Sequence, residues 1–333
     1  MLERRREPRS PFRKTRRALE RIEVLGAEVD LVRPEEVMYH VEAAVGDGRP
    51  YLVANHNLHS LYLLRRDPTL AAFFEDADLI EVDSAPVIAF SRALGLHSRP
   101  FHRCTYLDWR EHFWSVANRK AWRIFYLGGA PGVAESAAMQ LSEAYPATQI
   151  GVAHGYFDAS LGSAENAQIL EAIRHFSPDV LFVGMGMPRQ EQWIIDHRAQ
   201  LPPCAVFSVG AAFDYEAGVQ KPAPRWMGRA GLEWLFRLAH DPVRLWKRYC
   251  WEPWFMIRPA LCDIAAAWRA KRLLRSPPRS SRASGLDVVG QSPPVEGRLN
   301  LGVDRREPTS TPKIEKDLVA QSPEPAFVDR QKS

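Results

Sequence analysis

A carboxylate and a guanidinium that could carry out chemistry follow one apolar run of this sequence. Asp83 comes directly after Leu79–Val82, and Arg103 stands twenty residues further on in Phe101-His102-Arg103. A carboxylate can accept a proton from a reacting hydroxyl, and a guanidinium can stabilise negative charge that develops nearby. Asp83 and Arg103 are therefore the first candidates for catalytic residues.

Two glycine-rich turns supply further candidates. Gly128 and Gly129 follow the apolar run 124–127, and Gly184 and Gly186 follow the run 180–183. Backbone amides in such strand-to-helix turns can face a phosphate. The sequence lacks the Gly-Lys-Ser/Thr ending of a phosphate loop and the spacing of a dinucleotide fingerprint. An ordinary tight turn explains the first of them equally well.

Polar side chains follow the strands at two more places. Arg189, Gln190 and Glu191 begin the helical pattern after the second glycine turn, where helix capping by Glu191 is the purely structural alternative. Asn55 and Asn57 follow the first predicted strand of the core. Both sets are candidates for substrate binding.

Metal-binding patterns are weak in this chain. Asp76-Ala77-Asp78 forms a DxD pattern, but it precedes the strand at 79–82 and so lies at the opposite edge of the sheet from Asp83. The four cysteines are far apart and have no metal-ligand spacing. We therefore expect no metal site and no cofactor.

A basic, aromatic segment lies near the C-terminus. Residues 225–275 contain eleven Lys and Arg, four Asp and Glu, and six of the ten tryptophans, whereas the whole chain has a net charge of only +4. Concentrated positive charge interleaved with tryptophan favours a membrane interface over nucleic acid. An ordinary helical subdomain with buried tryptophans is the alternative.

Composition divides the 333 residues into four regions. We predict a flexible basic arm over 1–24 with a short helix at 15–22, a Rossmann-like domain over 25–222, a helical membrane-associating appendage over 223–275 and a disordered Pro/Ser-rich tail over 276–333. The chain has no run of eighteen apolar residues, and no apolar segment follows the basic N-terminus. These features predict a cytoplasmic protein without a spanning helix.

Alternating strand and helix patterns must position the candidate residues. Short buried strands are predicted at 51–54, 79–82, 124–127, 149–153, 180–183 and 205–209, and helices at 34–45, 58–65, 86–94, 106–117, 132–144, 165–176 and 190–198. This order predicts an α/β fold with a doubly wound, mostly parallel sheet. Ligands of such sheets bind at the carboxyl ends of the strands, where the candidates lie.

Several segments in the right order resemble the WecG/TagA/CpsF family, glycosyltransferase family 26, from about Glu23 to Tyr249. Residues 180–193 are similar to the glycine-rich PKQE element of the family, with Arg189 in place of Lys. Residues 210–218, which include Asp214, and the segments 222–226, 231–237, 241–244 and 248–249 resemble its C-terminal signature. Residues 124–138 are similar to a further family segment.

The resemblance implies an inverting transfer of a sugar from a UDP-sugar donor to a saccharide on a polyprenyl diphosphate, in bacterial surface polysaccharide synthesis. N-acetylmannosamine, its uronic acid and glucose are the sugars that relatives transfer. By motif, Asp83 matches the proposed general base, Arg103 the cation beside it, and Gln190 the glutamine of the PKQE element, and the resemblance implies that these three are catalytic residues. The basic residues of the membrane-docking appendage are matched by Arg237, Arg244, Lys247 and Arg248. Guanidinium groups in this set can stabilise a departing diphosphate without a metal, or they can instead hold the lipid diphosphate of the acceptor.

The family further implies a location on the inner face of the cytoplasmic membrane, with a UDP-sugar, a lipid-linked acceptor and the membrane surface as partners. We expect no nucleic acid partner, and association into a homo-oligomer stays open. Two alternatives remain: an inactive nucleotide-sugar-binding scaffold of a polysaccharide assembly complex, and a Rossmann-type oxidoreductase. The missing dinucleotide fingerprint disfavours the oxidoreductase.

Overall fold

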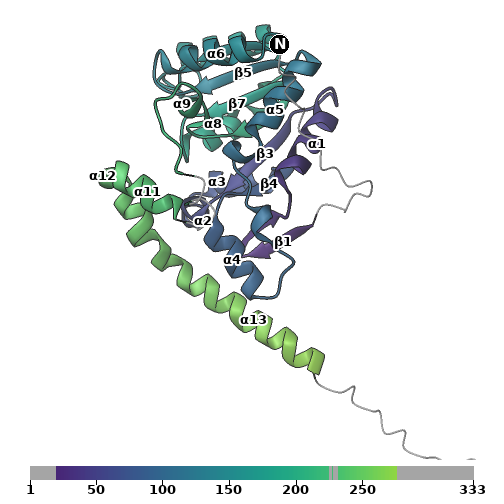
Figure 1. The fold of residues 1–333 in the computed structure, drawn as a ribbon, viewed down its shortest axis with the longest axis vertical. Coiled ribbons are helices and arrows are strands. Elements are labelled where there is room, and N and C mark those ends of the chain that lie inside the picture. The colour runs from purple at the N-terminus through teal and green to yellow at the C-terminus, as the bar shows by residue number, and fades with distance from the viewer. Residues whose placement is uncertain (1–19, 225–226, 228–231, 276–333) are drawn as a thin grey trace, which may run out of the picture. The chain divides into compact units, whose positions relative to one another are not determined.

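The computed structural model describes residues 20–224, 227 and 232–275. Within this part of the chain, six parallel strands form the central sheet in the order β4-β3-β8-β7-β5-β6 (Figure 1). They are β3 (Tyr51–His56), β4 (Leu79–Val82), β5 (Arg123–Gly128), β6 (Gln149–Ala153), β7 (Val180–Gly184) and β8 (Ala205–Ser208). The predicted α/β fold and the positions of the six predicted strands are confirmed. Continuous apolar runs suit strands that are buried on both faces, but β6, at the edge of the sheet, is only partly buried and not a buried strand as predicted.

Helices cover both faces of this sheet. One face packs against α1 (Pro34–Ala44), α5 (Tyr106–Lys120), α6 (Val133–Ala144) and α9 (Ala212–Glu216). The other face packs against α3 (Pro68–Glu75), α7 (Ala164–Phe176) and α8 (Arg189–His197). Neighbouring residues of each strand enter opposite cores, as in Leu181 and Phe182. Helix α2 (Leu58–Leu63) and α4 (Ala85–Ala93) follow β3 and β4.

Two helices were not predicted from the sequence. Helix α3 begins after Asp67, whose side chain accepts hydrogen bonds from the amides of Thr69 and Leu70, and has Pro68 in its first turn. An Asp-Pro pair commonly marks the start of a helix, and this pair is visible in the sequence. Helix α9 has only five residues, too few to display a helical period.

The N-terminal part of the described chain differs from the prediction. Strands β1 (Arg21–Val24) and β2 (Ala27–Asp30) form an antiparallel hairpin, so Arg21–Val24 are neither a flexible arm nor the end of a helix. The turn places Leu25 and Gly26 at φ of 54° and 66°. Asp30 is buried, pairs with Arg21 at 2.9 Å and accepts a hydrogen bond from the amide of Ile80 on β4. Tertiary bonds therefore stabilise a segment whose local sequence is highly charged. Residues 1–19 lie outside the described chain.

The sheet has a switch point between β5 and β7. Strand β5 continues outward through α6 to β6, whereas β7 continues in the opposite direction through α8 to β8. Because α6 and α8 lie on opposite faces, the loops after β5 and β7 separate at the carboxyl edge. A crevice at such a point is the usual ligand site of a doubly wound sheet.

The C-terminal segment is helical. It contains α11 (Glu233–His240), α12 (Pro242–Trp246), a π-helical turn η3 (Lys247–Trp251), a 3-10 turn η4 (Glu252–Met256) and α13 (Ile257–Arg275). Helix α12 begins at Pro242, directly after Asp241, an Asp-Pro pair of the kind that often starts a helix. No helix among the described residues is long and apolar enough to cross a membrane. The predicted disordered tail, 276–333, lies outside the described residues.

Candidate functional site

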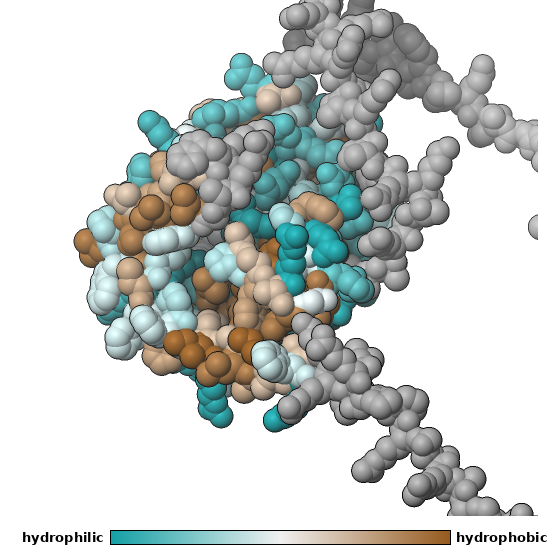
Figure 2. Space-filling view, turned by 60° about the horizontal axis from the view of Figure 1, so that its bottom comes forward, coloured by the Kyte–Doolittle hydropathy of each residue, from teal (hydrophilic) through white to brown (hydrophobic). Residues whose placement is uncertain are grey.

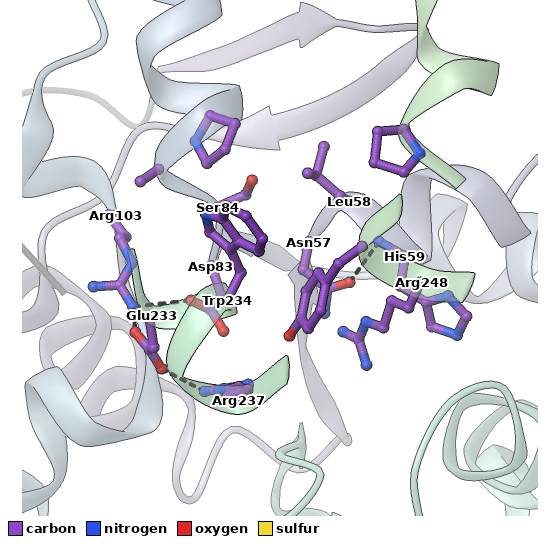
Figure 3. A pocket seen from close by; sticks show the side chains of 14 residues that line it. Asn57, Leu58, His59, Asp83, Ser84, Arg103, Glu233, Trp234, Arg237 and Arg248 are labelled. Atoms are coloured by element: carbon purple, nitrogen blue, oxygen red, sulfur yellow. Dashed lines mark hydrogen bonds and ion pairs between the residues drawn. The ribbon is translucent and has the colours of Figure 1, made fainter. Parts of the chain in front are cut away.

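A cavity of about 360 Å³ lies where the ends of β3 and β4 meet the C-terminal segment (Figure 3). The core contributes polar residues that follow these strands, and α11 to η4 contribute cations and aromatic rings. Polar, charged and aromatic side chains line the cavity, among them Asn57, His59, Asp83, Ser84, Arg103, Glu233, Trp234, Arg237, Arg248 and Tyr249. The structure therefore places Asp83 and Arg103 together with residues of the basic segment.

Strand pairing fixes the position of Asp83. Its amide donates to the carbonyl of His56 at 2.8 Å, which extends the β3–β4 ladder by one residue. The next residue, Ser84, caps α4 through its side chain. Asp83 is thus held between the end of a strand and the start of a helix, with its side chain at the cavity.

Arg103 reaches Asp83 because its own backbone lies alongside β4. Arg103 forms a parallel bridge with Val82, and the amide of Cys104 donates to the carbonyl of Val82 at 2.9 Å. The Arg103 Nη2 atom lies 3.4 Å from Asp83 Oδ1 and 2.5 Å from Glu233 Oε2. The other oxygen of Glu233 is 2.5 Å from Arg237 Nη2. Two carboxylates and two guanidiniums thus alternate along one wall of the cavity (Figure 3).

The environment of Asp83 suits a base. Burial raises the pKa of Asp83 to about 6, and the positive charges of Arg237 and Arg103 limit the rise. A quarter of the side chain, 25%, is still accessible to solvent. The carboxylate is therefore mostly ionised near neutral pH, more basic than an ordinary aspartate, and open to the cavity.

The predicted basic residues of the C-terminal segment separate into groups. Arg237 and Arg248 line the cavity, whereas the side chain of Lys247 is exposed and lies 6.0 Å from the ring centre of Trp246. Arg244 belongs to α12, and its side chain is outside the described atoms. Arg237 and Arg248 are thus the members of this set for which a cavity position is established.

The glycine turns meet at the switch point, away from the residues that line the cavity. A Cβ atom on Gly128 would overlap the carbonyl of Gly184, and one on Gly184 would overlap the carbonyl of Gly210. These two glycines are needed because neighbouring strand ends approach each other closely. Gly129 and Gly186 adopt φ of 69° and 79°, and a Cβ on Gly186 would meet open space.

The polar trio of α8 lies at the turn that follows β7, at the switch point of the sheet. Gln190 is buried, accepts from the amide of Gly186 at 3.1 Å and donates to Glu191 at 2.7 Å. Burial raises the pKa of Glu191 to about 7, and its second oxygen has no hydrogen bond among the described residues. Arg189 donates to the carbonyl of Phe157 at 2.5 Å. Gln190 therefore orders the loop around Gly186 and does not line the cavity with Asp83.

Asn55 and Asn57 have different environments. Asn55 donates to Glu81 at 3.4 Å and to the carbonyl of Cys104 at 3.3 Å, and it does not line the cavity. Asn57 does line the cavity, but its side-chain oxygen caps α2 by accepting from the amides of His59 and Ser60. Their closest contacts are thus with the protein itself.

Helix α9 has residues near the glycine turn after β5 and near the charged residues of the cavity. Asp214 lies beside Gly129, 3.6 Å from the position that a Cβ atom there would take. The charges of Arg237 and Asp83 act on the next residue, Tyr215, while burial is the main reason for its raised pKa. Tyr215 itself is not among the residues that line the cavity.

Several cavity residues were missed in the sequence. Glu233, Trp234, His59 and Tyr249 line it, and Glu252 lies behind His59. The cluster of tryptophans and arginines marked the C-terminal segment as a whole, but no local pattern indicates which of its acids face the core.

Large apolar side chains of the C-terminal segment are exposed. Figure 2 shows hydrophobic patches among hydrophilic residues on one face of the molecule. The exposed residues of η3 to α13 include Trp251, Trp254, Phe255, Leu261 and Trp268, with 59%, 68%, 39%, 60% and 71% of their surfaces accessible. The alternative of an ordinary subdomain with buried tryptophans does not fit these side chains.

Known proteins that resemble this chain share its family. Residues 22–276 match the glycosyl transferase WecG/TagA/CpsF family. Proteins of Staphylococcus aureus strains MW2, NCTC 8325 and MRSA252 are each 26% identical over 239 residues, which is 68% of this chain and 86% of theirs. Each is named N-acetylglucosaminyldiphosphoundecaprenol N-acetyl-beta-D-mannosaminyltransferase. The family match covers most of the described residues, including the carboxylate and the arginines of the cavity, and this chain therefore belongs to the WecG/TagA/CpsF family of glycosyltransferases.

Proposed function

We propose that this glycosyltransferase moves a sugar from a UDP-sugar to a saccharide carried on a polyprenyl diphosphate, with inversion at the anomeric carbon. The observation that carries the proposal is the cavity in which Asp83 lies with Arg103, Arg237 and Arg248. One carboxylate that can take a proton stands there among cations that can hold phosphate oxygens.

Asp83 acts as the general base in this reaction. It takes the proton of the acceptor hydroxyl while that oxygen attacks the anomeric carbon, and the bond from this carbon to the UDP oxygen breaks. UDP leaves with the bonding electrons. A single displacement inverts the anomeric centre. A pKa of about 6 leaves Asp83 ionised at neutral pH and still able to bind the proton.

Two diphosphates require two binding regions. We assign the nucleotide to the switch point of the sheet. Gly129 and Gly186 have positive φ angles there, and α8 begins at Arg189. The lipid diphosphate is assigned to Arg237 and Arg248 in the cavity. Helix α9 has Asp214 beside Gly129, and the charge of Asp83 acts on the next residue, Tyr215.

The relatives supply the first substrates to test. Their name specifies an N-acetylmannosaminyl group and an N-acetylglucosaminyl-diphosphoundecaprenol acceptor. The same class of acceptor suits the present cavity because its mouth is formed by the aromatic, basic segment. N-acetylmannosamine, its uronic acid and glucose are the candidate sugars.

Membrane binding follows from the composition of the exposed segment. Trp251, Trp254 and Trp268 can enter the interfacial region of a bilayer, and neighbouring arginines and lysines can bind anionic headgroups. We propose that the enzyme binds peripherally to the inner face of the cytoplasmic membrane, where a lipid-linked acceptor is within reach.

The test is UDP release from a panel of UDP-sugars, with and without a short-chain polyprenyl-diphosphate saccharide. Acceptor-dependent release from one donor, together with a glycosylated lipid product of inverted configuration, is the expected result. Release that does not depend on the acceptor, or donor binding with no turnover on any acceptor of this class, would contradict the proposal.

A further inference from the structure

We propose that His59, with Glu252 as its counter-ion, binds a diphosphate group in the cavity and takes up a proton when that ligand binds. The inference rests on the proposed function, since it concerns a diphosphate substrate of the same cavity. It adds a titrating ligand-binding residue to the arginines, and it makes substrate affinity depend on pH in a defined way.

The hydrogen bond between the two side chains orients the imidazole. His59 is in α2, and its Nδ1 lies 2.7 Å from Oε2 of Glu252 in η4. Both side chains are largely buried, with 20% and 11% of their surfaces accessible. His59 lines the cavity, whereas Glu252 does not. Because a carboxylate accepts, Nδ1 carries a hydrogen, and Nε2 is the nitrogen left for a ligand.

Burial, together with the positive charge of Arg248, favours the neutral His59 ring in the free enzyme. Burial lowers the pKa of His59, Arg248 lowers it further, and the hydrogen bond and charge of Glu252 raise it, with a net shift downward. Tyr62 stacks against the ring from the same helix at 6.5 Å between centres. Asp83, Arg103, Glu233 and Arg237 line the remainder of the cavity. A neutral ring bonded through Nδ1–H presents only a lone pair at Nε2.

Binding of a diphosphate favours the protonated form of the His59 ring over the neutral form. Phosphate oxygens accept hydrogen bonds, so they cannot bind the lone pair of a neutral Nε2. Their negative charge near His59 compensates Arg248 and favours the imidazolium. Once protonated, the ring donates to Glu252 through Nδ1 and to the ligand through Nε2. Sugar hydroxyls lack the charge needed to drive this protonation, which is why the geometry points to a diphosphate.

The sign of the pH effect follows from these two states. The pKa of His59 is below its ordinary value in the free enzyme and higher in the complex. Between the two pKa values, the complex binds one more proton than the free enzyme, and affinity decreases as pH rises. The decrease reaches at most about tenfold per pH unit for a single proton.

Calorimetric titration of the full-length protein across pH 5.5–8.5 tests the proposal. UDP is the ligand in one arm and farnesyl diphosphate in the other, so the arms separate the nucleotide from the lipid as the source of the diphosphate. His59→Gln keeps a polar side chain but cannot gain a proton. Subtracting its pH profile from that of the wild type removes the ionisation of the ligand itself.

We expect the wild type to lose affinity with rising pH more steeply than His59→Gln, by up to about tenfold per pH unit in at least one arm. Glu252→Gln removes the counter-ion charge and should move the steep region to lower pH. His175→Gln, an exposed histidine at the end of α7, is the matched control and should behave as wild type.

Identical pH profiles for wild type and His59→Gln in both arms would overturn the inference. Because the measurement is of binding, this result is distinct from failure of the proposed function, which would show as absent sugar transfer whatever the pH profile. A steeper wild-type profile with UDP alone would assign His59 to the nucleotide, and one with farnesyl diphosphate alone to the lipid.

Discussion

Replacing Asp83 by asparagine gives the sharpest test of the proposed chemistry. The substitution keeps the size of the side chain and removes its ability to accept a proton. Loss of a general base costs about 10²- to 10⁴-fold in rate, equivalent to about 3–5 kcal/mol of transition-state stabilisation. We therefore expect kcat to decrease by at least about a hundredfold while donor binding is largely retained.

The surroundings of Asp83 explain why binding should survive. Arg103 is 3.4 Å from Asp83 but 2.5 Å from Glu233, so the guanidinium keeps its closer carboxylate in the variant. The backbone bond from the amide of Asp83 to His56 does not involve the side chain. The wall of the cavity should thus remain in place.

The pH profile supplies a second readout. With a pKa of about 6, Asp83 is about nine-tenths ionised at pH 7. The wild-type rate should fall about tenfold per pH unit below pH 6, and this dependence should be absent from the residual rate of Asp83→Asn. Glu81→Gln is the matched control, because Glu81 lies two residues before Asp83, on β4, but bonds to Asn55 and Cys104 outside the cavity.

The assay is formation of the glycosylated lipid from a UDP-sugar and a short-chain polyprenyl-diphosphate saccharide, followed from pH 5 to 8. A rate for Asp83→Asn within a few-fold of wild type would refute the general-base assignment. Loss of activity in Glu81→Gln to the same extent would show that any change along β4 disrupts the site.

Three further predictions concern stability and membrane binding. Burial raises the pKa of Glu81 to about 7, so wild-type stability should decrease by about 3 kcal/mol more than that of Glu81→Gln as pH rises from 4.5 to 7. Glu191 and Asp83, whose pKa values burial also raises, contribute equally to both proteins. Urea unfolding measures both losses, and parallel pH curves would contradict this. Gly184→Ala should lower the free energy of unfolding by about 1–3 kcal/mol, because the new Cβ atom would overlap the carbonyl of Gly210. Urea unfolding measures this change, and an unchanged midpoint would contradict the close approach of the ends of β7 and β8. The double variant Trp251→Ala/Trp254→Ala should bind anionic vesicles at least about tenfold more weakly than wild type. The control is Met139→Ala, which removes an exposed apolar side chain of α6 and should bind as wild type does. Equal cosedimentation of the double variant and wild type with vesicles would exclude these rings from the membrane contact.

The sheet was predictable because its strands have a strong local signal. Val180–Gly184 is buried along its whole length, and an apolar run between turn residues is how such a strand looks in sequence. The β1–β2 hairpin lacks this signal, since its pairing depends on Asp30 bonding to Arg21 and to the backbone of β4. Bonds between distant residues leave no mark on the local pattern.

Only the part of the candidate site that the sheet domain contributes could be predicted from the sequence. Asp83 and Arg103 follow from the rule that ligands bind at the carboxyl ends of strands. Glu233 and Glu252 lie 130 and 193 residues from their partners Arg103 and His59, and packing of the C-terminal segment alone brings them there. Gly128 and Gly184 were predicted as substrate-binding residues, and the structure shows that a Cβ atom on either would overlap neighbouring backbone.

The C-terminal segment turns several of its carboxylates toward the core, and this has a thermodynamic consequence. Glu233 pairs with Arg103, Glu252 with His59, and Asp263 accepts from the amide of Leu25 at 2.6 Å. If the segment separated from the core, these carboxylates would lose their partners and the cavity would lose one of its walls. Under the proposed membrane binding, a bilayer that binds the docked segment more tightly than the separated one would act, in the terms of linkage, as an activator: it would shift the population toward the conformation in which the cavity is complete.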